Sequence, residues 1–199
     1  MFEGRGRGTA QPDPSDEATL LGALANGHED AMGALYQHHG ALIYRFSLRM
    51  VQDESIAEEI TQEVFLALLR QARQFDPALG KLSTWLCGIA RRLVWKHLER
   101  TRRLELIDDA NDTRASESAV VVLCRQEAIA IVQLGIARLP PHLKAVVVLC
   151  ELEEMSYEEA AAALDVPVGT IRSRLHRARQ RLAGLLQAEH KGREAPHES

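Results

Sequence analysis

Apolar residues recur along most of the chain at spacings of three or four, which is the period of an α-helix. The clearest stripe is formed by Ile56, Ile60, Val64 and Leu68, and Phe65 widens it. Acidic and amide side chains occupy the positions between them. This pattern predicts an amphipathic helix that buries one face and presents an acidic face to solvent.

Similar stripes predict three more helices in the N-terminal half. A turn at Asp76 and Pro77, followed by Gly80, separates the third helix from the fourth, and Ser83 is placed to cap the fourth. We interpret Trp85 as part of the apolar side of that helix rather than as an exposed stacking surface. The apolar positions are Leu20, Leu21 and Leu24 on the first helix, Leu35, Leu42, Phe46 and Met50 on the second, and Leu86, Ile89, Ala90 and Leu93 on the fourth.

The C-terminal part has the pattern of a short helix, a tight turn and a second helix. Ser156 and Glu159 have the order of a capping box, which predicts a helix over residues 157–164. Pro167 breaks the helical pattern, and Asp165 tolerates the left-handed backbone of a tight turn. The apolar seam of the second helix consists of Val168, Ile171, Leu175, Ala178, Leu182 and Leu185.

Two helices are expected before this pair, over residues 119–138 and 141–153, with a break at Pro140 and Pro141. The run Ala-Val-Val-Val-Leu-Cys occurs in both, at 119–124 and at 145–150. Such β-branched runs also occur in buried strands. The helix-forming flanks and the absence of hairpin turn signals favour helices, so we expect an all-α chain.

Charge is arranged in blocks, although the net charge of the 199 residues is only −4. Residues 170–181 contain five arginines and no acid, and residues 83–103 contain six basic residues against the single acid Glu99. Between these blocks, residues 105–118 carry five acids against Arg114 and have no helical stripe. This segment is interpreted as a flexible acidic linker.

A basic helix directly after a tight turn is typical of the helix-turn-helix, whose second helix enters the major groove of DNA. Arginine side chains there contact guanine edges and phosphates. The alternative interpretation is a solvated basic face on an ordinary bundle helix.

Several other classes of protein do not fit the sequence. No apolar run approaches the roughly 20 residues of a membrane span, and residues 1–17 contain no signal-peptide core, so we expect no membrane insertion and a cytoplasmic location. Cys87, Cys124 and Cys150 lack metal-binding spacing and are interpreted as reduced, buried thiols. His38 and His39 are interpreted as surface residues that do not chelate one ion. We expect no metal, no cofactor and no catalytic residue, since no nucleotide-binding glycine loop or nucleophile motif occurs.

Two groups of motifs resemble bacterial RNA polymerase sigma factors. The resemblance to their second conserved region rests on Ile60–Phe65 (ITQEVF), Phe75–Pro77, Trp85–Leu86, Ile89–Arg91 and His97–Leu98. The resemblance to their promoter-reading fourth region rests on Leu139–Pro141, Ser156–Ala160, Val168–Leu175 and Arg177–Arg179. The short linker is similar to that of the extracytoplasmic-function (ECF) subfamily.

The resemblance implies a subunit that docks on core RNA polymerase, recognises a promoter and opens it, with no catalysis of its own. It implies three contact surfaces. The polymerase surface, for the clamp helices of the largest subunit, consists of Asp53, Glu59, Gln62, Glu63 and Phe65. The minus-ten surface, where a flipped base is held, consists of Lys81, Leu82, Ser83, Arg91, Arg92, Lys96, His97 and Arg100. The upstream surface, for the minus-thirty-five element, consists of Thr170, Arg172, Ser173, Arg174, His176, Arg177 and Arg181.

Three positions depart from the family pattern. Arg92 stands where many members have asparagine, and Lys96 stands where many have aspartate. These two cations imply either a different minus-ten preference or one that leans more on phosphates. Asp165 replaces the usual glycine of the turn, and we expect the turn to be kept.

On this basis the chain divides into five segments. These are a disordered N-terminal extension (1–17), a region 2 domain (18–104), the acidic linker (105–118), a region 4 helix-turn-helix domain (119–188) and a flexible tail (189–199). The expected partners are promoter DNA, the clamp helices and flap of core RNA polymerase, and an anti-sigma factor. The alternative is a free-standing helix-turn-helix transcriptional regulator, which leaves the basic segment 83–103 without a partner.

Overall fold

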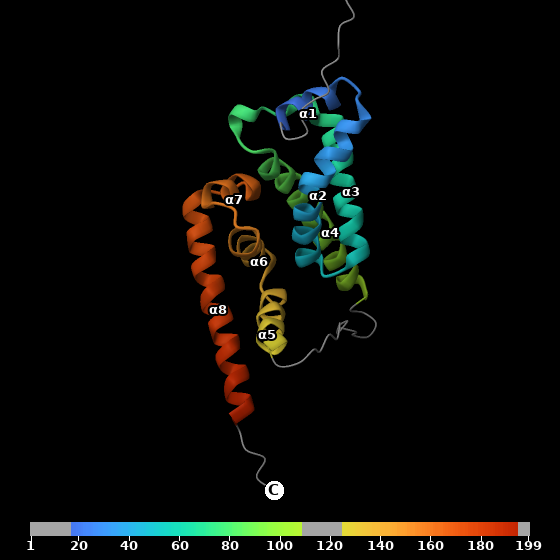
Figure 1. Ribbon diagram of the computed structural model, residues 1–199. Coiled ribbons are helices and arrows are strands. Elements are labelled where there is room, and N and C mark those ends of the chain that lie inside the picture. Colours follow the sequence, from blue (N-terminus) through green and yellow to red (C-terminus); the bar gives the residue numbers. More distant parts are fainter. Residues whose placement is uncertain (1–16, 109–124, 195–199) are drawn as a thin grey trace, which may run out of the picture.

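The structure, a computed structural model, describes residues 17–108 and 125–194 (Figure 1). These residues form helices joined by short turns, and no strand occurs among them. The expected all-α fold with two helical domains is therefore confirmed. Residues 1–16 of the predicted extension at 1–17, most of the predicted linker and the last five residues lie outside the described part of the chain, whereas Glu17 begins α1.

The N-terminal domain is a bundle in which α2 packs against α1, α3 and α4. Its core is closed by fully buried side chains such as Leu35, Phe46, Leu68 and Leu86, which belong to the stripes seen in the sequence. The elements are α1 (Glu17–Ala25), α2 (Glu29–Val51), α3 (Glu54–Gln71), the 3₁₀ turns η1 (Ala72–Gln74) and η2 (Pro77–Leu79), and α4 (Leu82–Asp108).

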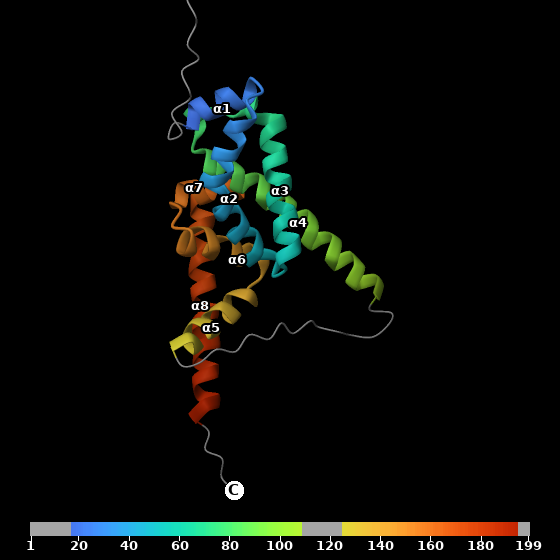
Figure 2. The ribbon, with the colours of Figure 1, turned by 45° about the vertical axis from the view of Figure 1, so that its right-hand side comes forward.

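Both ends of α4 differ from the sequence-based expectation. The Trp85 amide donates to the Lys81 carbonyl at 3.2 Å, so the helix begins at Leu82 and Ser83 lies in its first turn instead of capping it. Gly80, with φ of 151°, makes the change of direction just before the helix. At the other end α4 continues to Asp108, four residues into the predicted linker, because residues 104–108 contain neither glycine nor proline. In Figure 2 this end of α4 projects away from the bundle.

The C-terminal domain is built around α8, the long red helix of Figure 1. With 27 residues this helix is about 40 Å long. The second Ala-Val-Val-Val-Leu-Cys run is helical, which rejects the strand alternative there, whereas the first run lies outside the described residues. The elements are α5 (Arg125–Ala137), α6 (Pro141–Val147), the π-helical turn η3 (Val148–Leu152), α7 (Tyr157–Leu164) and α8 (Val168–Glu194).

The turn between α7 and α8 has the predicted chemistry. The Ser156 hydroxyl accepts from the Glu159 amide at 3.1 Å, and the Glu159 carboxylate accepts from the Ser156 amide at 2.8 Å, so the capping box is complete. Asp165 adopts φ 53° and ψ 53°, the left-handed conformation expected for it. Ile171 and Leu175 of the α8 seam are buried. The helix-turn-helix therefore forms from local signals in the sequence.

Two expectations about single residues are corrected. His39 is only 7 % exposed, because α1 packs over α2 and brings Glu17 to 3.1 Å from its Nε2. Cys87 is buried as expected, and burial raises the pKa of its thiol to about 12. Cys150 was also expected to be buried, but it is only half-buried. Cys124 lies outside the described residues. Among the residues that are described, no group of three or more histidine, cysteine or acidic side chains is placed to hold a metal.

The two domains touch each other directly. Helix α7 packs against α4, and α6 with η3 lies against α2 (Figures 1 and 2). None of the helices in the described ranges is long and apolar enough to span a membrane.

Candidate nucleic-acid interface

The upstream surface lies on the outer side of α8. Arg172, His176, Arg177 and Arg181 are exposed, as a contact surface for DNA requires. Thr170 and Arg174 are half-buried at its edge. The hydroxyl of the exposed Ser173 donates a hydrogen bond to the Thr170 carbonyl at 3.0 Å, so towards DNA it can act only as a hydrogen-bond acceptor.

One arginine of the cluster has a partner within the protein. Arg179 lies 2.5 Å from the Glu151 carboxylate of η3, and this hydrogen bond raises the pKa of the guanidinium. The pair joins α8 to the turn that precedes α7. Arg179 is therefore paired within the domain, while the other four arginines of residues 170–181 form no ion pair among the described residues.

The structure adds a residue that the sequence did not single out. His142, exposed in the first turn of α6, has its pKa lowered by partial burial and by the neighbouring charges of Arg174, Arg177 and Arg181. The start of α6 therefore lies beside the upstream surface. Nothing in the local sequence, where His142 follows Pro141, indicates that proximity.

The minus-ten surface follows α4 and the loop before it. Lys81, Arg92, Lys96 and Arg100 are exposed, whereas Ser83, Arg91 and His97 are half-buried. Leu82 is fully buried and is wrong as a contact residue. It lies one helical turn before Leu86 and shares the core-facing side of α4.

The loop before α4 and the first half of the helix border a cleft of about 340 Å³. Trp85 lines this cleft while its ring packs on Phe75, with the centroids 5.8 Å apart. It is half-buried and packs against the core, as expected for the apolar side of α4, while the rest of its surface lines the cleft. Leu79, 87 % exposed at the tip of η2, also lines the cleft and was not anticipated.

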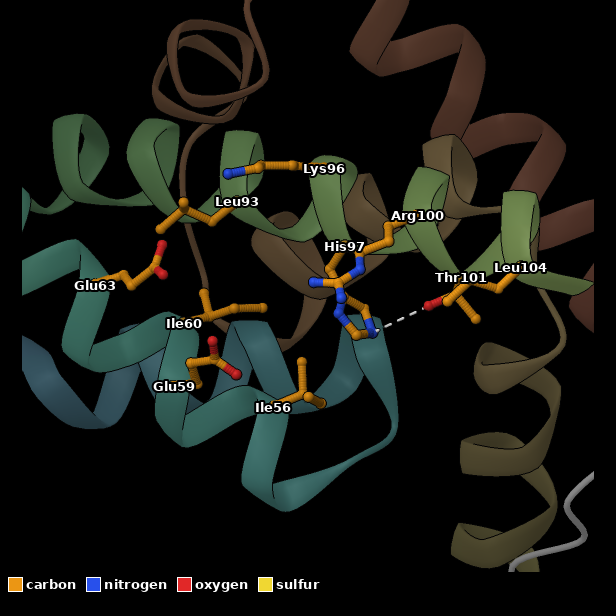
Figure 3. Close-up of a pocket in the computed structure, with 10 residues that line it drawn as sticks. All are labelled: Ile56, Glu59, Ile60, Glu63, Leu93, Lys96, His97, Arg100, Thr101 and Leu104. Atoms are coloured by element: carbon orange, nitrogen blue, oxygen red, sulfur yellow. Dashed lines mark hydrogen bonds between the residues drawn. The ribbon is translucent and has the colours of Figure 1, made fainter.

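A second groove lies between α3 and α4, with a volume of about 380 Å³ (Figure 3). Ile60 and Leu93 contribute apolar walls to it. In Figure 3 Arg100 reaches down from α4 and Glu59 reaches up from α3 into the same space. The His97 Nε2 lies 3.4 Å from the Thr101 hydroxyl on the same helix. Residues of the minus-ten surface and of the polymerase surface thus share one groove.

The polymerase surface is exposed except at one residue. Glu59, Gln62 and Glu63 are exposed on α3, where Glu59 and Glu63 also line the groove against α4. Asp53 caps that helix by accepting from the Ile56 amide at 2.9 Å. Phe65 is only 5 % exposed, so its assignment as a contact residue is corrected. Its ring packs 4.8 Å from the ring of Tyr36 and supports α3 from the core side.

Comparison with known proteins matches both domains to one family. The family description "Sigma-70 region 2" matches residues 35–104, and "Sigma-70, region 4" matches residues 129–182. The ECF RNA polymerase sigma factor SigE of Mycolicibacterium smegmatis is 34 % identical over 87 % of this chain and 70 % of its own length. The ECF sigma factor RpoE of Cereibacter sphaeroides is 30 % identical over 87 % of this chain and 97 % of its own.

A solved structure has a similar fold. CnrH, determined in complex with the cytosolic domain of CnrY, is 26 % identical with a TM-score of 0.64. The match covers 88 % of this chain and 99 % of CnrH.

Proposed function

Because the chain belongs to the ECF family of RNA polymerase sigma factors, we propose that its three surfaces divide promoter recognition among them. The upstream surface on α8 reads duplex DNA at the minus-thirty-five element. The minus-ten surface holds the opened strand. The polymerase surface on α3 docks on the clamp helices of the largest polymerase subunit.

The observation that carries this proposal is the separation of opposite charges onto different helices of one domain. Glu59 and Glu63 lie on α3 and Lys96 and Arg100 lie on α4, and each pair lines the groove between the two helices from its own helix. An acidic surface repels DNA and suits a basic protein partner, while a basic surface attracts phosphates. One small domain can therefore bind polymerase and single-stranded DNA at the same time.

The two DNA-binding surfaces have different tasks. Duplex DNA presents base edges in its major groove, so the arginines of α8 need only insert there. Opening the duplex costs a few kcal/mol for each flipped base. A cleft beside cations, with the Trp85 ring in its wall, supplies stacking and charge that offset this cost.

The proposal extends to the partners of the chain. CnrH was solved with a protein partner that has a cytosolic domain, and the fold of the present chain is similar to that of CnrH. We expect an anti-sigma factor to hold the chain by the surfaces that polymerase uses. The chain acts where core polymerase and the chromosome are, in the cytoplasm, and leaves catalysis to polymerase.

Co-elution tests the polymerase part of the proposal. The purified chain should co-elute with core RNA polymerase in size-exclusion chromatography, and the complex should protect two separate elements of a target promoter from DNase I. A chain that elutes apart from the core enzyme would contradict the proposal. Protection of a single palindromic site by the chain alone would favour a free-standing regulator.

A further inference from the structure

Leu79 is the most exposed large apolar side chain in the described part of the chain. It is 87 % exposed at the end of η2, whereas the next in order, Leu104 and Leu134, are 53 % and 52 % exposed. A single apolar residue on a surface needs no special explanation. The way in which the backbone holds Leu79, and the groups that lie beside it, therefore decide whether it has a function.

The loop before α4 holds Leu79 in a defined position. The Asp76 carboxylate accepts from the Ala78 amide at 2.9 Å, and the Leu79 amide donates to the Asp76 carbonyl at 3.0 Å. Pro77 fixes one backbone angle at the start of η2, and Gly80, with φ of 151°, turns the chain towards α4. Because these constraints limit the freedom of the loop, little conformational entropy is lost when Leu79 meets a partner.

Leu79 borders the cleft that has the Trp85 ring in its wall. Both residues line this space of about 340 Å³, and the Trp85 ring packs on that of Phe75. An aromatic ring can stack on any base. In Figure 1 the loop that contains η2 projects from the N-terminal bundle. Leu79 thus lies at the edge of the place where the proposed function puts an unstacked base.

A cation beside the same cleft indicates how a DNA strand would approach Leu79. Arg92 is exposed and lines the cleft from α4. A guanidinium binds the phosphates of a strand, whereas an apolar side chain gains nothing from contact with a phosphate. A strand that is held here by its phosphates therefore meets Leu79 with its bases.

Opening a duplex requires that base steps be unstacked, and this is costly. Some DNA-binding proteins insert an apolar wedge, such as leucine, between two base steps and partly unstack them. The wedge covers base faces that have lost their neighbours and keeps water away from them. A leucine on a constrained turn, beside a cleft with an aromatic wall, has the position that such a wedge requires.

We propose that Leu79 is an apolar wedge, which enters the base stack at the edge of the opened minus-ten segment and takes the place of the base that has left it. This inference rests on the proposed function of the minus-ten surface. Leu79 helps to separate the strands, whereas the cleft beside it receives the base. The wedge is needed while the duplex is being opened and much less once the strands are apart.

The test compares Leu79→Ala with the wild type on two forms of one promoter that the chain uses. One form is fully paired, and the other carries mismatches that keep the minus-ten segment open. Each protein is assembled with core RNA polymerase, and synthesis of a short initial RNA measures the open complex. Leu79→Ala should give about 10-fold less RNA on the paired promoter and lose only about 2-fold or less on the pre-opened one.

Two further variants at Leu79 separate apolar bulk from the shape of the loop. Leu79→Met keeps an apolar side chain of similar volume and should stay near the wild type, whereas the polar Leu79→Gln should fail like Leu79→Ala. Leu134→Ala on α5 removes the same side chain at another exposed position and should match the wild type on both templates. Circular dichroism checks that every variant keeps its helical content.

Three results would count against the wedge. Equal losses on the paired and the pre-opened promoter would overturn it, and so would full activity of Leu79→Ala on both. Weaker capture of Leu79→Ala by immobilised core polymerase would overturn it too, because the side chain would then contact a protein. Failure of a different kind, in which the wild-type chain gives no RNA with core polymerase even on the pre-opened promoter, would contradict the proposed function and the wedge with it.

Discussion

The ammonium group of Lys81 lies 2.6 Å from the carboxylate of Glu159, which also closes the capping box of α7. The hydrogen bond to Lys81, followed by that from the Ser156 amide, lowers the pKa of Glu159. One acid thus connects the loop before α4 with the start of the helix-turn-helix.

The capping box should contribute measurably to the stability of the helix-turn-helix. Ser156→Ala removes the hydroxyl that accepts from the Glu159 amide. We expect the free energy of unfolding to fall by about 1 kcal/mol in urea denaturation, the usual cost of losing an N-cap. Ser55→Ala, at an exposed position within α3, is the control and should change it little. Equal unfolding midpoints for Ser156→Ala and wild type would contradict the role of the cap.

The stability of the N-terminal domain should fall in mild acid because of His39. Burial lowers the pKa of this histidine below 6.5, although the nearby Glu17 partly opposes the shift and His38 adds to it. The unfolded chain therefore takes up a proton at a higher pH than the folded chain. The stability gained by keeping His39 neutral is complete above about pH 6.5 and is lost as the pH falls towards the lowered pKa.

Thermal unfolding at pH 7.5 and at pH 5.5 measures this loss. The melting temperature of the wild type should drop between the two, and that of His39→Gln should drop less. His176→Gln, at an exposed position on the outer side of α8, is the control, and its melting temperature should drop as much as that of the wild type. Identical drops in wild type and His39→Gln would show that another group is responsible.

Replacing an arginine of the upstream surface should weaken DNA binding more than replacing Arg179. Arg172→Ala or Arg177→Ala should weaken binding to the minus-thirty-five element by about 1 to 3 kcal/mol where the side chain contacts a base edge. Arg179→Ala should weaken it less, because that guanidinium is paired with Glu151. Gel-shift titration of the polymerase complex on promoter DNA measures the three affinities. Unchanged binding by both Arg172→Ala and Arg177→Ala would show that these residues do not contact the minus-thirty-five element.

The outer face of α3 should govern docking on polymerase without affecting folding. Gln62→Ala combined with Glu63→Lys changes only exposed side chains, so the helical content should stay the same. Capture by immobilised core polymerase should fall about 10-fold or more, because a lysine replaces an acid where a basic partner is expected. Asp30→Lys, exposed at the start of α2, makes the same charge reversal elsewhere and should be captured normally. Undiminished capture of the double variant would refute this docking surface.

Much of the fold was predictable because its signals are local. The stripe from Ile56 to Leu68 and the capping box of Ser156 and Glu159 depend on residues within a few positions of each other. Asp165 could be assigned a left-handed conformation because few residues other than glycine, asparagine and aspartate tolerate it. These features need no knowledge of how the helices pack.

What the sequence did not reveal depends on contacts between distant residues. Glu153 pairs with Arg45 across 108 positions, and no periodicity indicates that pairing. His39 is buried because a separate helix covers it, and Phe65 and Leu82 were assigned to contact surfaces although they complete the core. His142 approaches the arginines of α8 only through the packing of α6 on that helix.

Initiation of transcription tests the central claim most directly. Purified core RNA polymerase is supplied with this chain, nucleotides and a library of genomic promoter fragments, and the RNA 5′ ends are sequenced. The account predicts specific transcription starts that depend on the chain and share two sequence elements upstream. The shared element near minus thirty-five should be lost from the starts obtained with Arg172→Ala or Arg177→Ala. RNA starts that are the same with and without the chain would contradict it.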